Sequence, residues 1–180
     1  MTTTPQAQSG TTESGAAPAP GALPDGRFEG REAFRQALRD AMHQAAAQAW
    51  REIVFSDADF EDWPLGERAF VEDLQAWSHG GRRFVMLAKS YDPVLRLHPR
   101  FVAWRRTWSH IIECRRVAQA DRLDVPSLVL TPNWALQRID VDRCVGVCSQ
   151  APERRVALRE TLDHWLRQSA PGFPATTLGL

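Results

Sequence analysis

Lysine is nearly missing from this sequence, and neither sign of charge is in excess. Lys89 is the only lysine among 22 basic residues, and 22 acidic residues bring the formal net charge to zero. Nucleic acid and anionic membranes attract chains that are basic as a whole, so a neutral chain is disfavoured for both partners. Codon bias explains the arginine excess most simply, and recognition of anions by guanidinium groups is the alternative.

Cysteines are few, and long apolar runs are missing. Cys144 and Cys148 have three residues between them, which matches neither the usual zinc spacing nor a redox pair. On a strand they would share a face, as buried thiols do. No stretch approaches the roughly 20 apolar residues of a membrane-spanning helix, and the first residues do not resemble a secretion signal. We therefore expect a cytoplasmic chain in a reducing compartment.

Complete catalytic and nucleotide-binding motifs are missing as well. The chain has no glycine-rich phosphate loop of a standard spacing, and its five histidines form no His-Glu-x-x-His pair that would hold zinc on a helix. We therefore predict no catalytic residue, no bound metal and no cofactor.

What the sequence does contain is one domain behind a polar leader. Residues 1–27 consist mainly of Thr, Ser, Gly, Ala, Pro and Gln. Such a segment cannot bury enough apolar surface to offset the entropy of ordering, so it is predicted to be a disordered N-terminal tail. Residues 28–180 suffice for a single α/β domain whose core needs neither metal nor disulfide.

The hydrophobic pattern alternates between helical and strand periods along the domain. Predicted helices cover 32–50, Phe70 to Trp77, Pro99 to Trp108 and 152–169, and predicted strands cover 53–55, 84–87, 111–117, 127–130, 135–139 and 144–147. Helix and strand alternate in the first half, which favours parallel crossover units, whereas the later strands are spaced as antiparallel hairpins. The predicted fold class is α/β, a three-layer mixed sheet flanked by helices.

Polar residues follow the first two strands at the edge where open α/β sheets bind ligands. Asp57 and Asp59 end the first strand, and Lys89 and Asp92 follow the second. The candidate ligand-binding residues are Asp57, Asp59, Lys89, Asp92, His98, Arg100 and His110. The two histidines are more often structural than catalytic in such settings.

Asp57-Ala-Asp59 after a hydrophobic strand can be compared with haloacid-dehalogenase phosphatases. Their first aspartate is the nucleophile, the second is the acid, and Mg²⁺ lies between carboxylate and phosphate. Ser90 would suit their second motif. That scheme also needs a lysine after this serine, and the only lysine precedes it. Aspartates that cap a loop at the end of a strand are the simpler interpretation.

The seven tryptophans could stack on single-stranded nucleic acid beside arginine. Four of them continue apolar helical stripes and are predicted to pack in the core: Trp50, Trp77, Trp104 and Trp165. Trp63 and Trp134, in turn or strand-edge positions, remain for such a role.

Several short motifs occur in the order of a known family. They are Arg51-Glu-Ile-Val-Phe-Ser-Asp, Trp63-Pro-Leu, His98-Pro-Arg, Ser109-His110, and Leu162-Asp-His-Trp followed by Ser169 and Thr176-Thr-Leu-Gly-Leu. Over about residues 30–180 the chain resembles a proteobacterial family of uncharacterised domains that look like a single half of the phospholipase-D-like fold. The resemblance implies that fold, and either a homodimer or an acetyltransferase partner of the GNAT type.

Active phospholipase-D-like enzymes carry a His-x-Lys motif followed by an aspartate. No histidine of this sequence has lysine two residues on. His98-Pro-Arg100 comes nearest, but Arg105 stands where the aspartate belongs. The resemblance therefore implies the fold without its chemistry.

The predicted function is thus non-catalytic binding of a partner protein or a small anionic ligand. One alternative is a divergent enzyme that transfers phosphoryl or phosphatidyl groups and uses His98 or His110. The other is a nucleic-acid-binding module built on Arg82, Arg83, Arg105, Arg106, Arg115 and Arg116.

Overall fold

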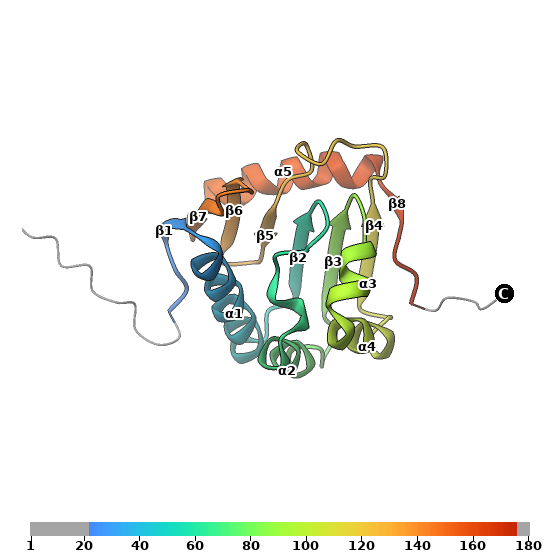
Figure 1. Cartoon of the computed structure of the whole chain (residues 1–180). Coiled ribbons are helices and arrows are strands. Elements are labelled where there is room, and N and C mark those ends of the chain that lie inside the picture. Colours follow the sequence, from blue (N-terminus) through green and yellow to red (C-terminus); the bar gives the residue numbers. More distant parts are fainter. Residues whose placement is uncertain (1–21, 176–180) are drawn as a thin grey trace, which may run out of the picture.

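The computed structural model describes residues 22–175, which form a mixed sheet with helices on both faces (Figure 1). The strands are β1 (Gly26–Glu29), β2 (Glu52–Asp57), β3 (Arg83–Ala88), β4 (Ile112–Arg116), β5 (Leu128–Leu130), β6 (Ala135–Asp140), β7 (Val145–Ser149) and β8 (Ala170–Pro171). The helices are α1 (Arg31–Gln48), α2 (Arg68–Trp77), α3 (Asp92–Leu97), α4 (Pro99–Thr107) and α5 (Pro152–Gln168), with a 3-10 turn at Pro64–Gly66.

The sheet has a parallel half and an antiparallel half that meet at β2. Its strand order is β1-β7-β6-β5-β2-β3-β4-β8. β2 pairs in parallel with β3, and β3 with β4, whereas β5, β6, β7 and β1 continue the sheet in antiparallel pairs on the other side of β2. The α/β class and the division into parallel and antiparallel halves are confirmed.

The helices divide unequally between the two faces of the sheet. Figure 1 shows α1, α2, α3 and α4 in front of the strands and α5 across the back. α1 forms as its apolar period indicates, with Phe34, Leu38, Met42 and Ala45 buried against the sheet. Within residues 22–175, no helix combines the length and apolar character needed to cross a bilayer.

The two faces accordingly have cores of different size. The core under α1 to α4 is rich in aromatic rings, with Phe55 and Phe84 packed edge to face at 4.8 Å between ring centroids. The core under α5 is smaller and aliphatic, and the helix contributes Leu158 and Leu162 to it. Cys144 and Cys148 are both buried in the aromatic core as predicted. Cys144 nevertheless precedes β7 with a left-handed φ of 51°, so its predicted place on the strand was wrong.

Three short elements were not predicted: β1, α3 and β8. None is long enough to show a hydrophobic period, and β1 forms because it pairs with β7. Residues 1–21 of the predicted tail lie outside the described residues, while Gly26 and Arg27 at its end belong to β1.

Trp63 and Trp134 were expected to be free of the core, and this was wrong. Both side chains are fully buried. The Trp63 ring lies 4.9 Å from the rings of Phe55 and Phe60, and the indole N–H of Trp134 donates to the carbonyl of Pro24 at 2.8 Å. A residue in a turn can point inward, and neither helical nor strand periodicity reveals that direction.

Candidate ligand-binding site

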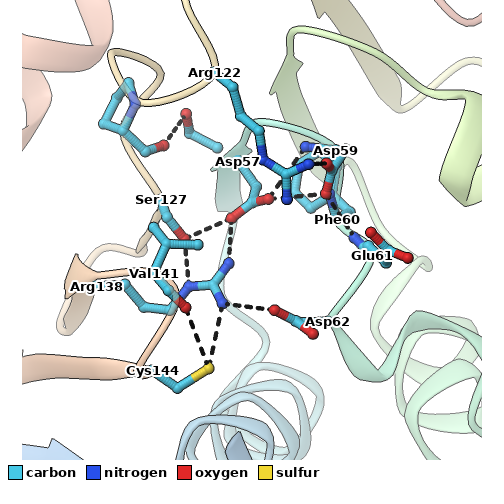
Figure 2. Close-up of polar contacts among 12 residues, drawn as sticks. Asp57, Asp59, Phe60, Glu61, Asp62, Arg122, Ser127, Arg138, Val141 and Cys144 are labelled. Carbon is cyan, nitrogen blue, oxygen red and sulfur yellow. Dashed lines mark hydrogen bonds and ion pairs between the residues drawn. The ribbon is translucent and has the colours of Figure 1, made fainter.

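The carboxyl end of β2 lies where the parallel half of the sheet meets the antiparallel half. In open α/β sheets this edge, beside a change in strand order, is where ligands bind. Asp57 is the last residue of β2, and the loop that follows it turns sharply, since Phe60 has a left-handed φ of 60°. The side chains around this loop come from β2, β6 and the segment before β5 (Figure 2).

The carboxylate of Asp57 is buried and accepts four hydrogen bonds. Its Oδ1 accepts the backbone N–H groups of Asp59 at 3.2 Å and Phe60 at 3.0 Å. Its Oδ2 accepts the Ser127 hydroxyl at 2.5 Å and the Arg138 Nη2 at 2.6 Å. Because a carboxylate offers about four lone-pair positions, Asp57 has no acceptor capacity left for a metal ion or substrate.

Arg138, from β6, is the counter-charge of Asp57. Its Nε donates to the Ser127 hydroxyl at 2.7 Å, and its Nη1 reaches Asp62 Oδ2 at 3.4 Å. The guanidinium also lies over the Phe34 ring, 4.2 Å from its centroid. We call Asp57, Asp62, Ser127 and Arg138 the buried network (Figure 2).

The electrostatics of this network favour a charged Asp57. Burial by itself would raise the pKa of Asp57, but the charge of Arg138 and the hydrogen bonds from Ser127 and two backbone N–H groups lower it below its usual value. Asp57 is therefore ionised and paired at neutral pH.

Asp59 lies two residues further along and behaves differently. Burial and the nearby charge of Asp57 raise the pKa of Asp59, although the Glu61 N–H and Arg122 oppose the shift. Its Oδ2 pairs with Arg122 Nη1 at 2.8 Å, and most of the Arg122 side chain is exposed. Asp59 thus links the buried network to an arginine at the surface.

A cavity of about 480 Å³ opens beside the buried network. We call it the arginine cavity, and its lining residues are Arg31, Arg35, Glu61, Asp62, Leu97, Arg122, Val141 and Asp142. Arg31 pairs with Asp62 at 2.9 Å. The Nε of Arg35 donates to the Asp62 backbone carbonyl at 2.7 Å. The lining therefore presents guanidinium and carboxylate groups together, with little apolar surface.

Of the seven predicted residues, the structure brings four to the end of β2. Asp57 ends β2 and Asp59 lies in the loop that follows. The backbone N–H of Lys89 donates to the Ala58 carbonyl at 3.0 Å. His98 Nε2 lies 3.0 Å from the Phe60 carbonyl, and burial lowers the pKa of His98, so its neutral ring donates this bond. The Lys89 ammonium itself donates to the Ala120 carbonyl at 2.5 Å.

The other three predicted residues lie apart. Asp92 is exposed at the first residue of α3, and Arg100 donates to the Gly66 carbonyl at 3.1 Å on the helical layer. His110 precedes β4, which runs parallel to β2 through β3, so His110 lies at the opposite end of the sheet. The seven candidate residues therefore do not converge on one site, and a binding role for each stays a prediction.

Sequence reasoning missed Ser127, Arg138 and Arg122. Ser127 and Arg138 reach Asp57 from 70 and 81 residues away along the chain. The alternation of apolar residues along β6 did not mark Arg138 as buried. Leu136 and Arg138 share a face of β6 and are both buried, whereas Ile139 on the other face is 68% exposed.

Metal binding has no obvious place in the described part of the chain. Across residues 22–175, no group of three or more His, Cys, Asp and Glu side chains is placed to hold a metal ion. Of the three carboxylates that line the arginine cavity, Asp62 is already paired with Arg31 and Arg138.

Comparison with known proteins gives a fold relationship and no family. No protein-family model matches the sequence, and no curated protein matches it significantly. Among solved structures, the chain is similar to TrmBL2, described as an archaeal chromatin protein that shows a novel mode of DNA binding, with a TM-score of 0.60 and 12% identity. The match covers 81% of this chain and 53% of that one, about half its length.

At that identity the likeness to TrmBL2 shows a shared fold alone. It does not test the resemblance to phospholipase-D-like halves, the homodimer or the acetyltransferase partner, which stay predictions.

Proposed function

We propose that this domain is a non-catalytic binding module for a small polar ligand that has an anionic group, held in the arginine cavity. The observation behind the proposal is the saturated carboxylate of Asp57. The residue that sequence reasoning placed first at the site has four hydrogen-bond donors and a buried guanidinium partner.

A nucleophilic or metal-binding aspartate needs a free oxygen that faces the ligand. Asp57 instead organises the loop: it binds the Phe60 N–H, while His98 and the Trp63 N–H bind the Phe60 carbonyl. These contacts hold Phe60 in its left-handed conformation and so fix the wall of the cavity. In this proposal Asp57 is a positioning residue.

The cavity lining indicates the chemistry of the ligand. Guanidinium groups bind phosphate or carboxylate through paired N–H donors. Arg35 has no carboxylate partner among the described residues, and Arg122 is exposed beyond its contact with Asp59. Glu61 and Asp142 lie on the same lining and would accept hydrogen bonds from hydroxyl or ammonium groups. The ligand should therefore combine an anionic group with such donors.

O-phosphoserine has both kinds of group and serves as the probe. In isothermal titration calorimetry at low salt, we expect the wild-type chain to bind it and the Arg122→Met variant to bind at least about tenfold more weakly, since a hydrogen-bonded charge contributes about 1.5–3 kcal/mol. Arg51→Met is the matched control, because Arg51 is an exposed arginine outside the cavity and its loss should leave binding unchanged.

Two results would contradict the proposal. One is the absence of binding by the wild-type chain to both O-phosphoserine and inorganic phosphate. The other is equal weakening by Arg122→Met and Arg51→Met, which would indicate a non-specific charge effect.

Nucleic-acid binding is the second candidate, and the likeness to TrmBL2 is what favours it. The six arginines predicted for it do not form one surface. Arg105 is buried, and Arg83 pairs with Glu52 and Glu113. Fluorescence anisotropy with a short DNA duplex decides between the candidates. Binding that weakens steeply with salt would favour nucleic acid, and no binding at low salt would remove it.

A further inference from the structure

Arg105 is a buried arginine without a carboxylate partner. It lies in the last turn of α4, is 6% exposed and points toward β4. Its Nε donates to the Cys114 sulfur at 3.4 Å. Its Nη1 is buried and has no hydrogen-bond partner among the described residues. A buried cation in such surroundings is unfavourable unless an anion pairs with it.

One side chain covers the guanidinium, and it comes from the segment after β8. The Phe173 ring centroid lies 4.7 Å from the guanidinium carbon of Arg105. The same ring stacks on Tyr91, with centroids 5.0 Å apart and an angle of 18° between the planes. These contacts form one buried cluster, which we call the aromatic slot; its members are Tyr91, Phe173, Cys114 and Arg105.

The segment that carries Phe173 joins the sheet through the short strand β8. β8 has two residues, and beyond it the Gly172 N–H donates to the Cys114 carbonyl at 2.9 Å. Phe173 itself has a left-handed φ of 46°, a conformation that bulky side chains adopt rarely and at a cost of about 1–3 kcal/mol. In Figure 1 this segment runs from β8 down the outer edge of the domain.

We propose that Arg105 is the anion-binding group of a second ligand site, which Phe173 covers and a small aromatic carboxylate opens. The ligand ring would take the place of the Phe173 ring on Tyr91, and its carboxylate would meet the unpaired Nη1 of Arg105. The aromatic slot selects this class because an aromatic ring already packs against both the phenol of Tyr91 and the guanidinium of Arg105, and because the missing partner of Arg105 is an anion. The site is separate from the arginine cavity and does not depend on the proposed function.

Phenylacetate is the probe, with phenylacetamide and acetate as its matched controls. We expect phenylacetate to raise the melting temperature of the full chain, and the uncharged amide and the ringless acetate to have little effect at the same concentration. Arg105→Met should abolish this rise. Arg106→Met, the exposed neighbouring arginine on the same helix, should retain it.

Phe173→Ala supplies a second measurement that needs no change at Arg105. Removing the ring that competes for the slot should tighten phenylacetate binding, by about tenfold where the covered state predominates. Calorimetry on the variant and the wild-type chain measures this difference.

Three results would overturn the proposal. They are an equal thermal shift in Arg105→Met and the wild-type chain, an equal shift with phenylacetamide, and unchanged or weaker binding in Phe173→Ala.

Discussion

Arg138 and Arg105 are buried to almost the same degree, with 4% and 6% of the residue exposed. Each lies against an aromatic ring, Phe34 in one case and Phe173 in the other. Both guanidinium groups also donate to a cysteine sulfur. Arg138 binds Asp57, Ser127 and Asp62 in addition, whereas Arg105 keeps one nitrogen unpaired. The two arginines are thus equally buried, but only the charge of Arg138 is paired with carboxylates.

The difference separates two uses of a buried arginine. A buried ion pair that is fully hydrogen-bonded fixes one arrangement of the chain, and removing one partner is costly. A buried charge without a partner lowers stability, and such groups are found where a ligand supplies the missing contact. We therefore propose a structural role for Arg138 and a ligand-binding role for Arg105. Replacing Arg138 should lower the free energy of unfolding, and replacing Arg105 should raise it.

The largest expected effect follows from removing the charge of Asp57. Asp57→Asn removes the nearest anion of the buried Arg138 and leaves only the longer contact with Asp62, so the free energy of unfolding should fall by about 3–5 kcal/mol. Urea denaturation followed by circular dichroism measures the change. Asp124→Asn, an exposed aspartate in the segment before β5, is the control and should change stability by less than about 0.5 kcal/mol. An effect of Asp57→Asn as small as the control would show that the buried network contributes little.

The same contribution should depend on pH. The pKa of Asp57 is lower in the folded chain than its usual value of 3.8. Between the two values the unfolded chain binds a proton that the folded chain does not, so the free energy of unfolding rises with pH there. The stabilisation is complete above about pH 5 and is lost as the pH falls through the folded value. Wild-type and Asp57→Asn chains should therefore converge in stability below about pH 4, and a constant gap would contradict this.

The sequence predicted the position of Asp57 because only local information was needed. A β-branched and aromatic run ends at Asp57, and the end of a parallel strand at the point where the sheet changes direction is a ligand edge on general grounds. The second strand was predicted for the same reason, and the backbone N–H of Lys89 at its end donates to the Ala58 carbonyl.

The partners of Asp57 could not be predicted in the same way. Ser127 and Arg138 come from strands whose register against β2 is set by pairing across the whole sheet, and no local pattern specifies that register. Arg105 had a local signal, because it lies four residues after the buried Phe101 and so on the same face of α4. The cover provided by Phe173 depends on how the chain after α5 returns to β4.

Ser127→Ala should have the next largest effect. The hydroxyl donates to Asp57 and accepts from Arg138, so its loss leaves one buried N–H of Arg138 without an acceptor. We expect the free energy of unfolding to fall by about 1–3 kcal/mol. Urea denaturation of Ser127→Ala, Asp57→Asn and the double variant gives the coupling energy between the two residues. Additive losses of stability would show that the two residues do not act together.

Arg105→Met should have the opposite sign. The change removes an unpaired buried donor and keeps an unbranched apolar chain in its place, so stability without ligand should increase by about 1 kcal/mol. Arg138→Met, in contrast, should lower stability, because it leaves Asp57 unpaired. Both are measured by urea denaturation. A loss in Arg105→Met equal to that in Arg138→Met would show that the thiol and ring contacts already satisfy Arg105.

The smallest effect on stability is expected for Asp59→Asn. This variant compares two aspartates of the same loop, the paired Asp57 and the more exposed Asp59. Burial and the charge of Asp57 raise the pKa of Asp59, so its ionised form is disfavoured in the folded chain, whereas that of Asp57 is favoured. Asparagine keeps the acceptor for the Glu61 N–H and loses only a partly exposed pair with Arg122. We expect a change within about 0.5 kcal/mol at neutral pH, because such pairs contribute little. Urea denaturation of Asp59→Asn and Asp57→Asn under the same conditions measures the difference. An equally large loss of stability in Asp59→Asn would mean that Asp59 belongs to the buried network. The distinction between a structural Asp57 and a surface-linked Asp59 would then be wrong.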